Sequence, residues 1–372
     1  MQRRDHPLPE RTLGTARRLS SFHYGPTDRD RKVYVQASLH ADELPGMLVT
    51  HHLRGHLAAL EADGRLRCEV VVVPIANPVG LSQWLLRSPI GRFELGSGEN
   101  FNRLYPALRD AVWARIAPSL GGDAEANARR VRAALREACA TLPADDELTA
   151  LRRTLLTLAC DAEVVLDLHC DAEAVLHLYT GTPLWPQCEP LARLMGAEAT
   201  LLALESGDQP FDEACSSLWW ELAERAGPAR PIPPGCLSVT VELRGMADVS
   251  HALAQRDAQA LVDFLVHRGL VDGEVPALPP LKHEATPLAG SMPVMATASG
   301  VLAWHVEPGT WVREGQPLCD VIDPVEGRVA TLASPVEGLF YARDNLRFVT
   351  AGTRVCKVAG REATRTGKLL SA

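Results

Sequence analysis

Residues 33–43 read VYVQASLHADE, and residues 44–60 continue as LPGMLVTHHLRGHLAAL. The first seven residues are rich in β-branched and aromatic side chains, which is typical of a strand. From Leu44 onward, apolar side chains recur at helical spacing. The stretch therefore predicts a strand that turns directly into a helix, with His40 and Glu43 on the turn.

The turn carries two side chains that can bind a metal ion. Catalytic zinc takes three protein ligands, histidine and glutamate among them, and leaves a fourth position to water. The chain has 12 histidines, so a surface histidine followed by a first-turn glutamate is the alternative on this stretch alone. We also expect Asp42 to cap the helix and Pro45 to lie in its first turn, where a missing N–H costs nothing.

The composition is that of a globular protein with a large core. The chain has 372 residues, 46% hydrophobic and 23% charged, which predicts two domains or one large domain with an appendix. The net charge is −8 without a dense basic tract, which argues against a nucleic-acid partner. No apolar run reaches bilayer length and no signal peptide is evident, so we expect no membrane association and a cytoplasmic location. Nine cysteines without a Cys-x-x-Cys pair favour reduced thiols.

Strand-like and helix-like stretches alternate along most of the chain. This alternation predicts an α/β fold with a mixed, largely parallel sheet and flanking helices. Glycine and polar residues punctuate residues 81–104, which predicts a long loop. The predicted strands are residues 33–39, 70–75, 163–168, 175–179 and 237–243, and the predicted helices are residues 44–60, 124–142, 145–159, 185–195, 212–226 and 251–270.

The pattern changes after residues 271–290, a proline-rich segment that predicts a linker. We therefore divide the chain into a larger domain, residues 1–286, and a small C-terminal all-β domain, residues 287–372. The second part has a faint repeat of residues 300–319 at residues 338–356, and it resembles a barrel-sandwich of the biotinyl/lipoyl type. A swinging-arm carrier of that type needs a lysine at a hairpin tip. None lies between Lys282 and Lys357, so we expect a structural module that covers the other domain or serves in assembly.

Two further polar residues lie at the ends of predicted strands. His169 follows the strand at residues 163–168, and Glu242 lies near the end of the strand at residues 237–243. Ligands of open α/β sheets bind at the carboxyl ends of strands, so both are expected at the same sheet edge as His40. A buried glutamate is costly unless it is paired or functional. The alternatives are a loop histidine with its hydrogen bonds satisfied, and a Glu242 bonded to Arg244 or to the backbone.

Six short motifs occur in the order seen in a known enzyme family. Over residues 30–270 the chain resembles the succinylglutamate desuccinylase/aspartoacylase family, a branch of the zinc carboxypeptidase superfamily. The resemblance implies a zinc carboxypeptidase-like fold for the larger domain, which would be the catalytic one, and a C-terminal β domain is also usual there. The motifs are His40-Ala41-Asp42-Glu43, Asn77-Pro78, Gly91-Arg92-Phe93, Asn100-Phe101-Asn102-Arg103, Asp167-Leu168-His169 and Val241-Glu242.

The resemblance also implies the roles of individual residues. Two departures from the family pattern stand beside it: Ala41 occupies a position where glycine is common, and a long loop before Asn102 leaves Arg87 as an alternative to Arg92. The implied roles are ligands of one Zn²⁺ per chain for His40, Glu43 and His169, general base for Glu242, oxyanion stabilisation for Arg92, and binding of a substrate carboxylate for Asn102 and Arg103.

These roles together predict hydrolysis of an amide bond. We expect a zinc-dependent deacylase that releases an amino acid or amine from a small N-acyl amino acid. The alternatives are a carboxypeptidase-like metallopeptidase acting on short peptides and a non-catalytic binding module. The intact ligands and Glu242 argue against the module. The acyl group, the amino acid and a homo-oligomeric state are left open by the sequence.

Overall fold

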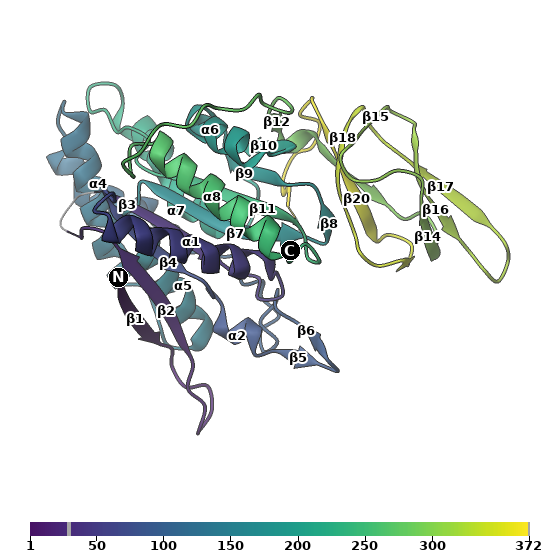
Figure 1. Cartoon of the computed structure of the whole chain (residues 1–372), viewed down its shortest axis with the longest axis horizontal. Helices are drawn as coiled ribbons and strands as arrows, with labels where there is room; N and C mark the ends of the chain where they lie inside the picture. Colours follow the sequence, from purple (N-terminus) through teal and green to yellow (C-terminus); the bar gives the residue numbers. More distant parts are fainter. Residues whose placement is uncertain (28–30, 371–372) are drawn as a thin grey trace.

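A computed structural model describes residues 1–27 and 31–370, and its largest part is a nine-stranded sheet between two layers of helices (Figure 1). The strand order is β1-β2-β4-β3-β7-β11-β9-β10-β12. Strands β4, β3, β7 and β11 are mutually parallel, as are β9, β10 and β12, whereas β1–β2, β2–β4 and β11–β9 pair antiparallel. The predicted mixed, largely parallel sheet is confirmed. The strands are β1 (Gln2–Pro7), β2 (Arg18–Tyr24), β3 (Lys32–Ala37), β4 (Glu69–Val73), β7 (Val164–Asp171), β9 (His177–Gly181), β10 (Ala199–Ala203), β11 (Leu237–Gly245) and β12 (Thr286–Pro287).

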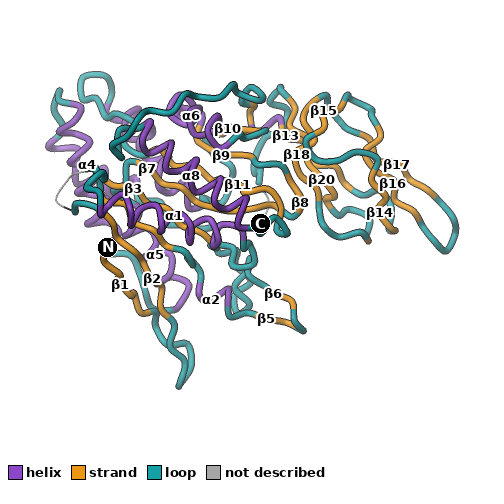
Figure 2. Tube along the Cα trace, viewed as in Figure 1, coloured by secondary structure: helices purple, strands orange, loops and turns teal. Residues whose placement is uncertain are grey.

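Helices cover both faces of this sheet (Figure 2). Helices α1 (Pro45–Ala62), α6 (Trp185–Met195) and α8 (His251–His267) pack on one face, and α3 (Arg109–Ile116), α4 (Ala124–Ala140), α5 (Glu147–Ala159) and α7 (Phe211–Ala226) pack on the other. Neighbouring residues of one strand enter opposite cores: Val165 faces the α7 side and Leu166 faces the α1 side. Central strands are thus buried on both faces, which explains their nearly continuous apolar sequences.

The predicted helices are confirmed with small changes at their ends, but the N-cap prediction is wrong. The chain turns tightly after His40, with Glu43 N–H donating to the His40 carbonyl. Helix α1 therefore starts two residues later than a cap at Asp42 would require, and its N-cap residue is Leu44. Pro45 lies in the first turn of the helix, as predicted.

Several elements were not predicted. Strands β1, β2 and β10 and the helices α2 (Pro78–Leu81) and α3 are additional. Helix α2 ends where the predicted loop at residues 81–104 begins, and the loop contains a small exposed hairpin, β5 (Trp84–Leu85) and β6 (Ser88–Pro89). The predicted linker also contributes β12 to the edge of the large sheet. Strand β1 has the sequence QRRDHP, nearly all of it exposed, so its pairing with β2 rather than apolar periodicity makes it a strand.

Residues after β12 form two antiparallel sheets, which we call the β module. Its core includes Leu302, Val312, Phe340 and Val355. We keep the barrel-sandwich assignment and the division at residues 286 and 287 as proposals. One sheet has the order β13 (Ser291–Met295), β20 (Arg354–Gly360), β18 (Gly338–Arg343) and β15 (Thr310–Val312), and the other has β17 (Val329–Ala333), β16 (Pro317–Ile322), β14 (Gly300–Trp304) and β19 (Phe348–Val349).

The β module is joined firmly to the large sheet. The short strand β8 (Glu173–Ala174), which directly follows β7, pairs antiparallel with β18 of the module. A shared apolar cluster that includes Tyr179, Leu201, Leu339 and Tyr341 fills the joint. The module therefore lies against the end of the sheet at which β7 terminates (Figure 1). In the described ranges, no helix is both long and apolar enough to cross a membrane.

Candidate active site

Three adjacent parallel strands bring the predicted residues to one edge of the sheet. His40 follows β3, His169 lies on β7, and Glu242 lies on β11 directly opposite His169 in the strand register. Glu43 lies in the turn that enters α1. This edge is the carboxyl end of the parallel strands, where open α/β sheets bind their ligands.

Two neighbouring loops fix the turn that carries His40 and Glu43. Asn77 Nδ2 donates to the Leu39 carbonyl at 2.9 Å, while its Oδ1 accepts from the Gly80 N–H at 2.7 Å. The Ala41 N–H donates to the Gly91 carbonyl at 3.0 Å. A side chain at residue 91 would collide with the backbone of residues 41 and 42, so glycine is required for this close approach.

His40, Glu43 and His169 form a compact buried cluster. Each can offer one ligand atom such that all three atoms lie within 4.8 Å of one another. His40 Nδ1 lies 2.9 Å from Glu43 Oε1, and His169 Nδ1 lies 2.8 Å from Glu43 Oε2. The three residues are only 3–4% exposed. Both imidazoles thus direct their Nδ1 atoms toward the carboxylate of Glu43.

Both outer ring nitrogens lie close to an oxygen atom. His40 Nε2 lies 2.9 Å from Asn100 Oδ1, and His169 Nε2 lies 3.0 Å from Asp167 Oδ2, at ion-pair distance but without hydrogen-bond geometry. Asn100 Oδ1 also accepts from the Asn102 N–H at 2.8 Å. Acceptors at both Nε2 atoms favour the tautomers with a proton there, which leaves the Nδ1 lone pairs directed at Glu43. Carboxylate or carbonyl oxygens on the outer nitrogens are usual for metal-ligating histidines.

This arrangement fits a metal ion. A lone pair on Nδ1 and a carboxylate oxygen repel each other at 2.8–2.9 Å unless a proton or a cation lies between them. Two histidines and one glutamate are the donor set of one type of catalytic zinc site. The cluster is therefore a candidate metal centre, as predicted from the sequence.

The electrostatic environment agrees with this reading for His40. Burial lowers the pKa of His40 to about 4, and the Arg92 guanidinium adds to the effect. For His169, burial also lowers the pKa, but the Asp167 and Glu43 carboxylates outweigh it and raise the pKa well above its ordinary value. The two imidazoles hold the pKa of Glu43 well below its ordinary value despite burial. A cation in the cluster would take the place of the proton that His169 otherwise keeps.

Glu242 lies beside the cluster without the partners that its structural alternative requires. Arg244 pairs instead with the buried Asp257. The Glu242 Oε2 atom is buried and has no hydrogen-bond partner within residues 1–27 and 31–370. Burial, and then the Glu43 carboxylate, raise the pKa of Glu242 to about 8. A bound cation lowers such a pKa, because it favours the charged form.

Arg92 reaches the cluster and Arg87 does not. Arg92 Nη2 donates to Glu43 Oε1 at 2.9 Å, and Nη1 lies 3.4 Å from His40 Nε2. Arg87 lies between β5 and β6 at the exposed end of their hairpin, with a φ of +73°. The structure therefore places Arg92, rather than Arg87, at the site.

Asn102 and Arg103 are both buried beside the cluster. The Asn102 side chain is occupied, since its Oδ1 accepts from the Phe211 N–H at 2.8 Å and so ties the loop to the start of α7. Arg103 Nη1 donates to the Asn102 carbonyl at 2.6 Å, and its guanidinium lines the adjoining cavity. Arg103 thus lines the cavity, whereas the side chain of Asn102 holds the loop in place.

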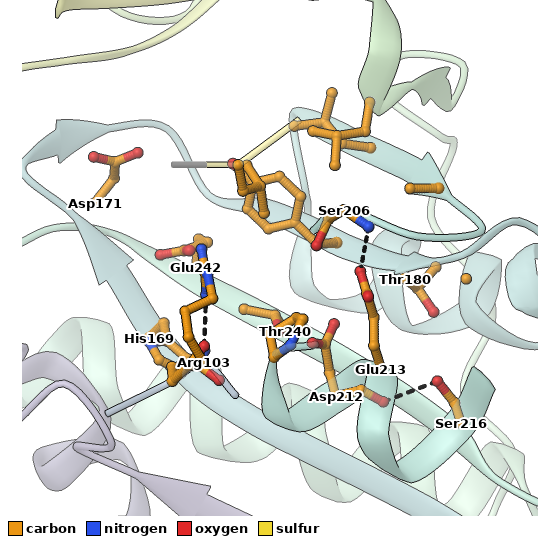
Figure 3. Close-up of a pocket in the computed structure, with 18 of the residues that line it drawn as sticks. Arg103, His169, Asp171, Thr180, Ser206, Asp212, Glu213, Ser216, Thr240 and Glu242 are labelled. Atoms are coloured by element: carbon orange, nitrogen blue, oxygen red, sulfur yellow. Dashed lines mark hydrogen bonds between the residues drawn. The ribbon is translucent and has the colours of Figure 1, made fainter. Parts of the chain in front are cut away.

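The cavity beside the cluster has a volume of about 110 Å³. His40, His169, Arg92, Arg103 and Glu242 line one part of it, and residues of β9, β10, α7 and β20 line the rest. Figure 3 shows Glu242, His169 and Arg103 on one side of this space, with Asp212 and Glu213 entering from α7. The site is therefore a pocket with reactive groups at one end and further polar side chains at the other.

Comparison with known proteins identifies the family. A sequence profile for the succinylglutamate desuccinylase/aspartoacylase catalytic domain matches residues 29–268. The chain belongs to the succinylglutamate desuccinylase/aspartoacylase family. A search of curated proteins finds no match.

Solved structures of similar proteins have the same fold. A family protein from Shewanella amazonensis SB2B has a TM-score of 0.85 at 25% identity, over 96% of this chain and 98% of that chain. One from Shewanella frigidimarina NCIMB 400 has a TM-score of 0.84 at 24% identity, over 96% and 97% of the two chains. The product-bound ectoine utilization protein of Ruegeria pomeroyi gives 0.66 at 16% identity, over 96% and 93%. The shared fold thus extends over the β module.

The β module contributes to the family site, which the sequence did not predict. Lys357, on β20, forms an ion pair with Asp171, two residues beyond His169, and its Nζ lies 5.3 Å from the centre of the Tyr341 ring. Arg354 of the same strand also lines the cavity. The module is therefore more than a distant cover, because one of its strands forms a wall of the pocket.

Lys357 allows a direct test of the carrier hypothesis. Its side chain is 15% exposed and ion-paired within a strand, whereas a modifying enzyme needs a lysine at an exposed hairpin tip. We expect the intact mass of the purified protein to equal the mass of its sequence, without biotin or lipoate. An adduct that peptide mapping places on Lys357 would contradict the structural role.

Proposed function

We propose that the protein is a zinc-dependent amidohydrolase that cleaves the amide bond of a small N-acyl amino acid. One observation carries the proposal: the cluster of His40, Glu43 and His169 adjoins the partnerless carboxylate oxygen of Glu242 in a pocket that Arg92 and Arg103 also line. Membership of the desuccinylase/aspartoacylase family supports the same chemistry.

His40, Glu43 and His169 would hold the zinc ion. When bound, zinc supplies Lewis acidity toward the scissile carbonyl and makes a water molecule more acidic, with a pKa near 7 instead of 15.7. Asn100 and Asp167 keep the two imidazoles oriented through their outer nitrogens. Glu43 is in turn held by the Cys170 N–H at 3.1 Å and by Arg92 at 2.9 Å.

Glu242 would act as the general base. Its carboxylate takes a proton from the attacking water and passes it to the nitrogen of the scissile amide. The C–N bond then breaks to give a carboxylate and a free amine. Such proton transfer is typically worth about 10²–10⁴-fold in rate. Arg92, beside the cluster, would stabilise the negative charge that develops on the carbonyl oxygen, so it would act mainly in the transition state.

Arg103 would bind the substrate carboxylate. A guanidinium is always charged and forms two parallel hydrogen bonds with a carboxylate. We expect Arg103→Ala to raise KM for an N-acetyl amino acid by about 10- to 100-fold, since hydrogen bonds to charged groups contribute about 1.5–3 kcal/mol. The matching α-carboxamide substrate should be affected far less. Steady-state kinetics on both compounds measures the difference.

Arg87→Ala is the matched control for this prediction, because it removes an arginine from the exposed hairpin of the same loop region. It should leave both KM values near those of the unmodified enzyme. Equal losses for the acid and the amide in Arg103→Ala would place Arg103 outside carboxylate binding.

The proposed function is tested with a substrate panel and a metal analysis of the same preparation. We expect hydrolysis of N-acetyl or N-succinyl amino acids, with about one zinc per chain, and little hydrolysis of dipeptides. A preference for dipeptides would establish the carboxypeptidase-like alternative. Absence of turnover on the whole panel, with metal bound, would favour a binding module.

A further inference from the structure

The end of the pocket away from the metal ligands carries two adjacent carboxyl groups. Asp212 and Glu213 lie in the first turn of α7, and both line the cavity. Figure 3 shows their side chains rising from α7 toward Thr240 and Ser206. Neither forms an ion pair with another side chain in the part of the chain that the structure describes. Glu213 Oε1 accepts only a backbone bond, from the Ser206 N–H at 2.6 Å.

A second feature of this end also indicates a ligand. The side chain of Ser206 lines the cavity, and the residue is 3% exposed. Its hydroxyl has no hydrogen-bond partner among the residues that the structure describes. A buried hydroxyl without a partner is costly. A ligand with an N–H group could donate to this oxygen.

The acidic end is suited to a cation. Burial, and then the charge of Asp167, raise the pKa of Asp212 to about 6. Burial and Asp212 raise the pKa of Glu213 to about 7. Both shifts arise because negative charges are held close together in a poorly solvated place. The charge of Arg103 lowers the pKa of Asp212 but does not cancel the shift, so a second positive group would relieve the remaining cost. Trp220 and Tyr179 also line the cavity, and aromatic side chains are favourable neighbours for a cation.

The distance from the acidic pair to the reacting centre can be judged from strand β11. The Thr240 side chain lies close enough to the Asp212 carboxylate to lower its pKa, and Thr240 lies two residues before Glu242 on the same face of the strand. Residues so related are roughly 6.5 Å apart. A side chain of about three methylene groups covers a similar length, because each carbon–carbon bond is about 1.5 Å long.

We propose that Asp212 and Glu213 bind the cationic side-chain group of the substrate, so that the enzyme acts on Nα-acylated basic amino acids. The inference rests on the proposed function. Arg103 at the metal end would hold the α-carboxylate, and the acidic pair would hold the side-chain ammonium group. The pocket thus carries a guanidinium and two carboxyl groups, which match the opposite charges of an ornithine-like substrate.

A structural role gives a different expectation. Acidic residues in the first turn of a helix are favoured by the helix dipole, and α7 has no side-chain N-cap. In that case a neutral replacement of Asp212 or Glu213 should lower the melting temperature and leave the choice of substrate unchanged. The test must therefore measure selectivity rather than activity alone.

The experiment compares kcat/KM for Nα-acetyl-L-ornithine, Nα-acetyl-L-norleucine and Nα-acetyl-L-glutamate. Norleucine replaces the ornithine ammonium group with a methyl group of similar size. We expect ornithine to be preferred over norleucine by about 10- to 100-fold, the range of a charge-assisted hydrogen bond, and glutamate to be the poorest substrate. Asp212→Asn and Glu213→Gln should each bring the ornithine-to-norleucine ratio toward one.

Glu224→Gln is the matched control, because Glu224 is an exposed residue of the same helix and does not line the cavity. It removes the same charge from α7 and should keep the ratio of the unmodified enzyme. If Asp212→Asn fails to fold, Glu213→Gln carries the test. Calorimetric titration with L-ornithine and L-norleucine adds a measurement that does not depend on turnover.

The outcomes separate the two proposals. Hydrolysis that favours norleucine or glutamate would overturn the inference and leave the deacylase function intact. An unchanged ratio in both cavity variants would also overturn it and assign the acidic pair to helix stability. Tighter binding of L-ornithine than of L-norleucine, lost in Glu213→Gln but without any hydrolysis, would support the cation site and refute the deacylase function.

Discussion

Glu242→Gln is expected to reduce turnover by about 10²–10⁴-fold, or roughly 3–5 kcal/mol of activation free energy, while the metal content stays full. Glutamine keeps the size of the side chain but cannot accept the proton from water. Glu242 is not one of the three residues of the metal cluster, so the metal should remain. KM should change little, because the lost interaction belongs mainly to the transition state. Single-turnover kinetics measures the loss of turnover, and metal analysis of the same sample measures the zinc content.

A purely structural role for Glu242 would require a partner such as Arg244, but Arg244 is paired with Asp257. If Glu242 served only stability, its replacement would lower the melting temperature and preserve turnover per folded molecule. Glu69→Gln is a suitable control, because Glu69 lies on β4 of the same sheet and pairs with His23 away from the cavity. Glu69→Gln should lower the melting temperature somewhat and leave the turnover rate unchanged. Loss of zinc together with activity would make Glu242 a ligand or a support for the ligands.

His169→Ala is expected to remove most of the metal and, with it, nearly all activity. The purified enzyme should carry about one zinc per chain, and the variant would keep only two of the three protein ligands. The change also leaves Asp167 without its imidazole neighbour in a fully buried position. We therefore expect a lower melting temperature as well, which calorimetry can measure beside the metal content.

His52→Ala is the matched control for the metal measurement. His52 is a partly exposed residue of α1 whose Nε2 lies 3.0 Å from His251 Nδ1, so this pair could collect metal ions on the surface. The control should lower any excess metal and keep both the tightly bound ion and the activity. Activity in protein that has been freed of metal would end the hypothesis of a metal enzyme.

The sequence predicted the parts of the fold that rest on apolar periodicity. Central strands such as residues 70–73 are buried on both faces and appear as continuous apolar runs, and the helices that cover them are amphipathic. Strand β1 could not be found in this way, because QRRDHP is nearly all exposed and its strand structure comes from pairing with β2. The N-cap prediction at Asp42 was also wrong because of a contact that periodicity does not show: the tight turn after His40 moves the start of the helix to Pro45.

The metal cluster was predictable because His40 and His169 lie at the ends of recognisable strands and belong to motifs, His40-Ala41-Asp42-Glu43 and Asp167-Leu168-His169, that resemble those of the family. Lys357 offered no such signal. It lies 186 residues beyond its partner Asp171 and becomes part of the site only when the β module packs on the sheet. Asp212 and Glu213 appeared in the sequence as ordinary acidic residues at a helix start, and only the position of α7 beside β11 turns them toward the cavity.

The position of Lys357 on β20 also affects the order in which the site is made. Synthesis proceeds from the N-terminus, and Lys357 emerges 115 residues after Glu242. At typical synthesis rates this is a delay of roughly 6–23 s. During that interval a nascent chain can already contain all three metal ligands and the base, but the wall formed by β20 does not yet exist. The three metal ligands and the base are therefore synthesised before the strand that forms one wall of their pocket.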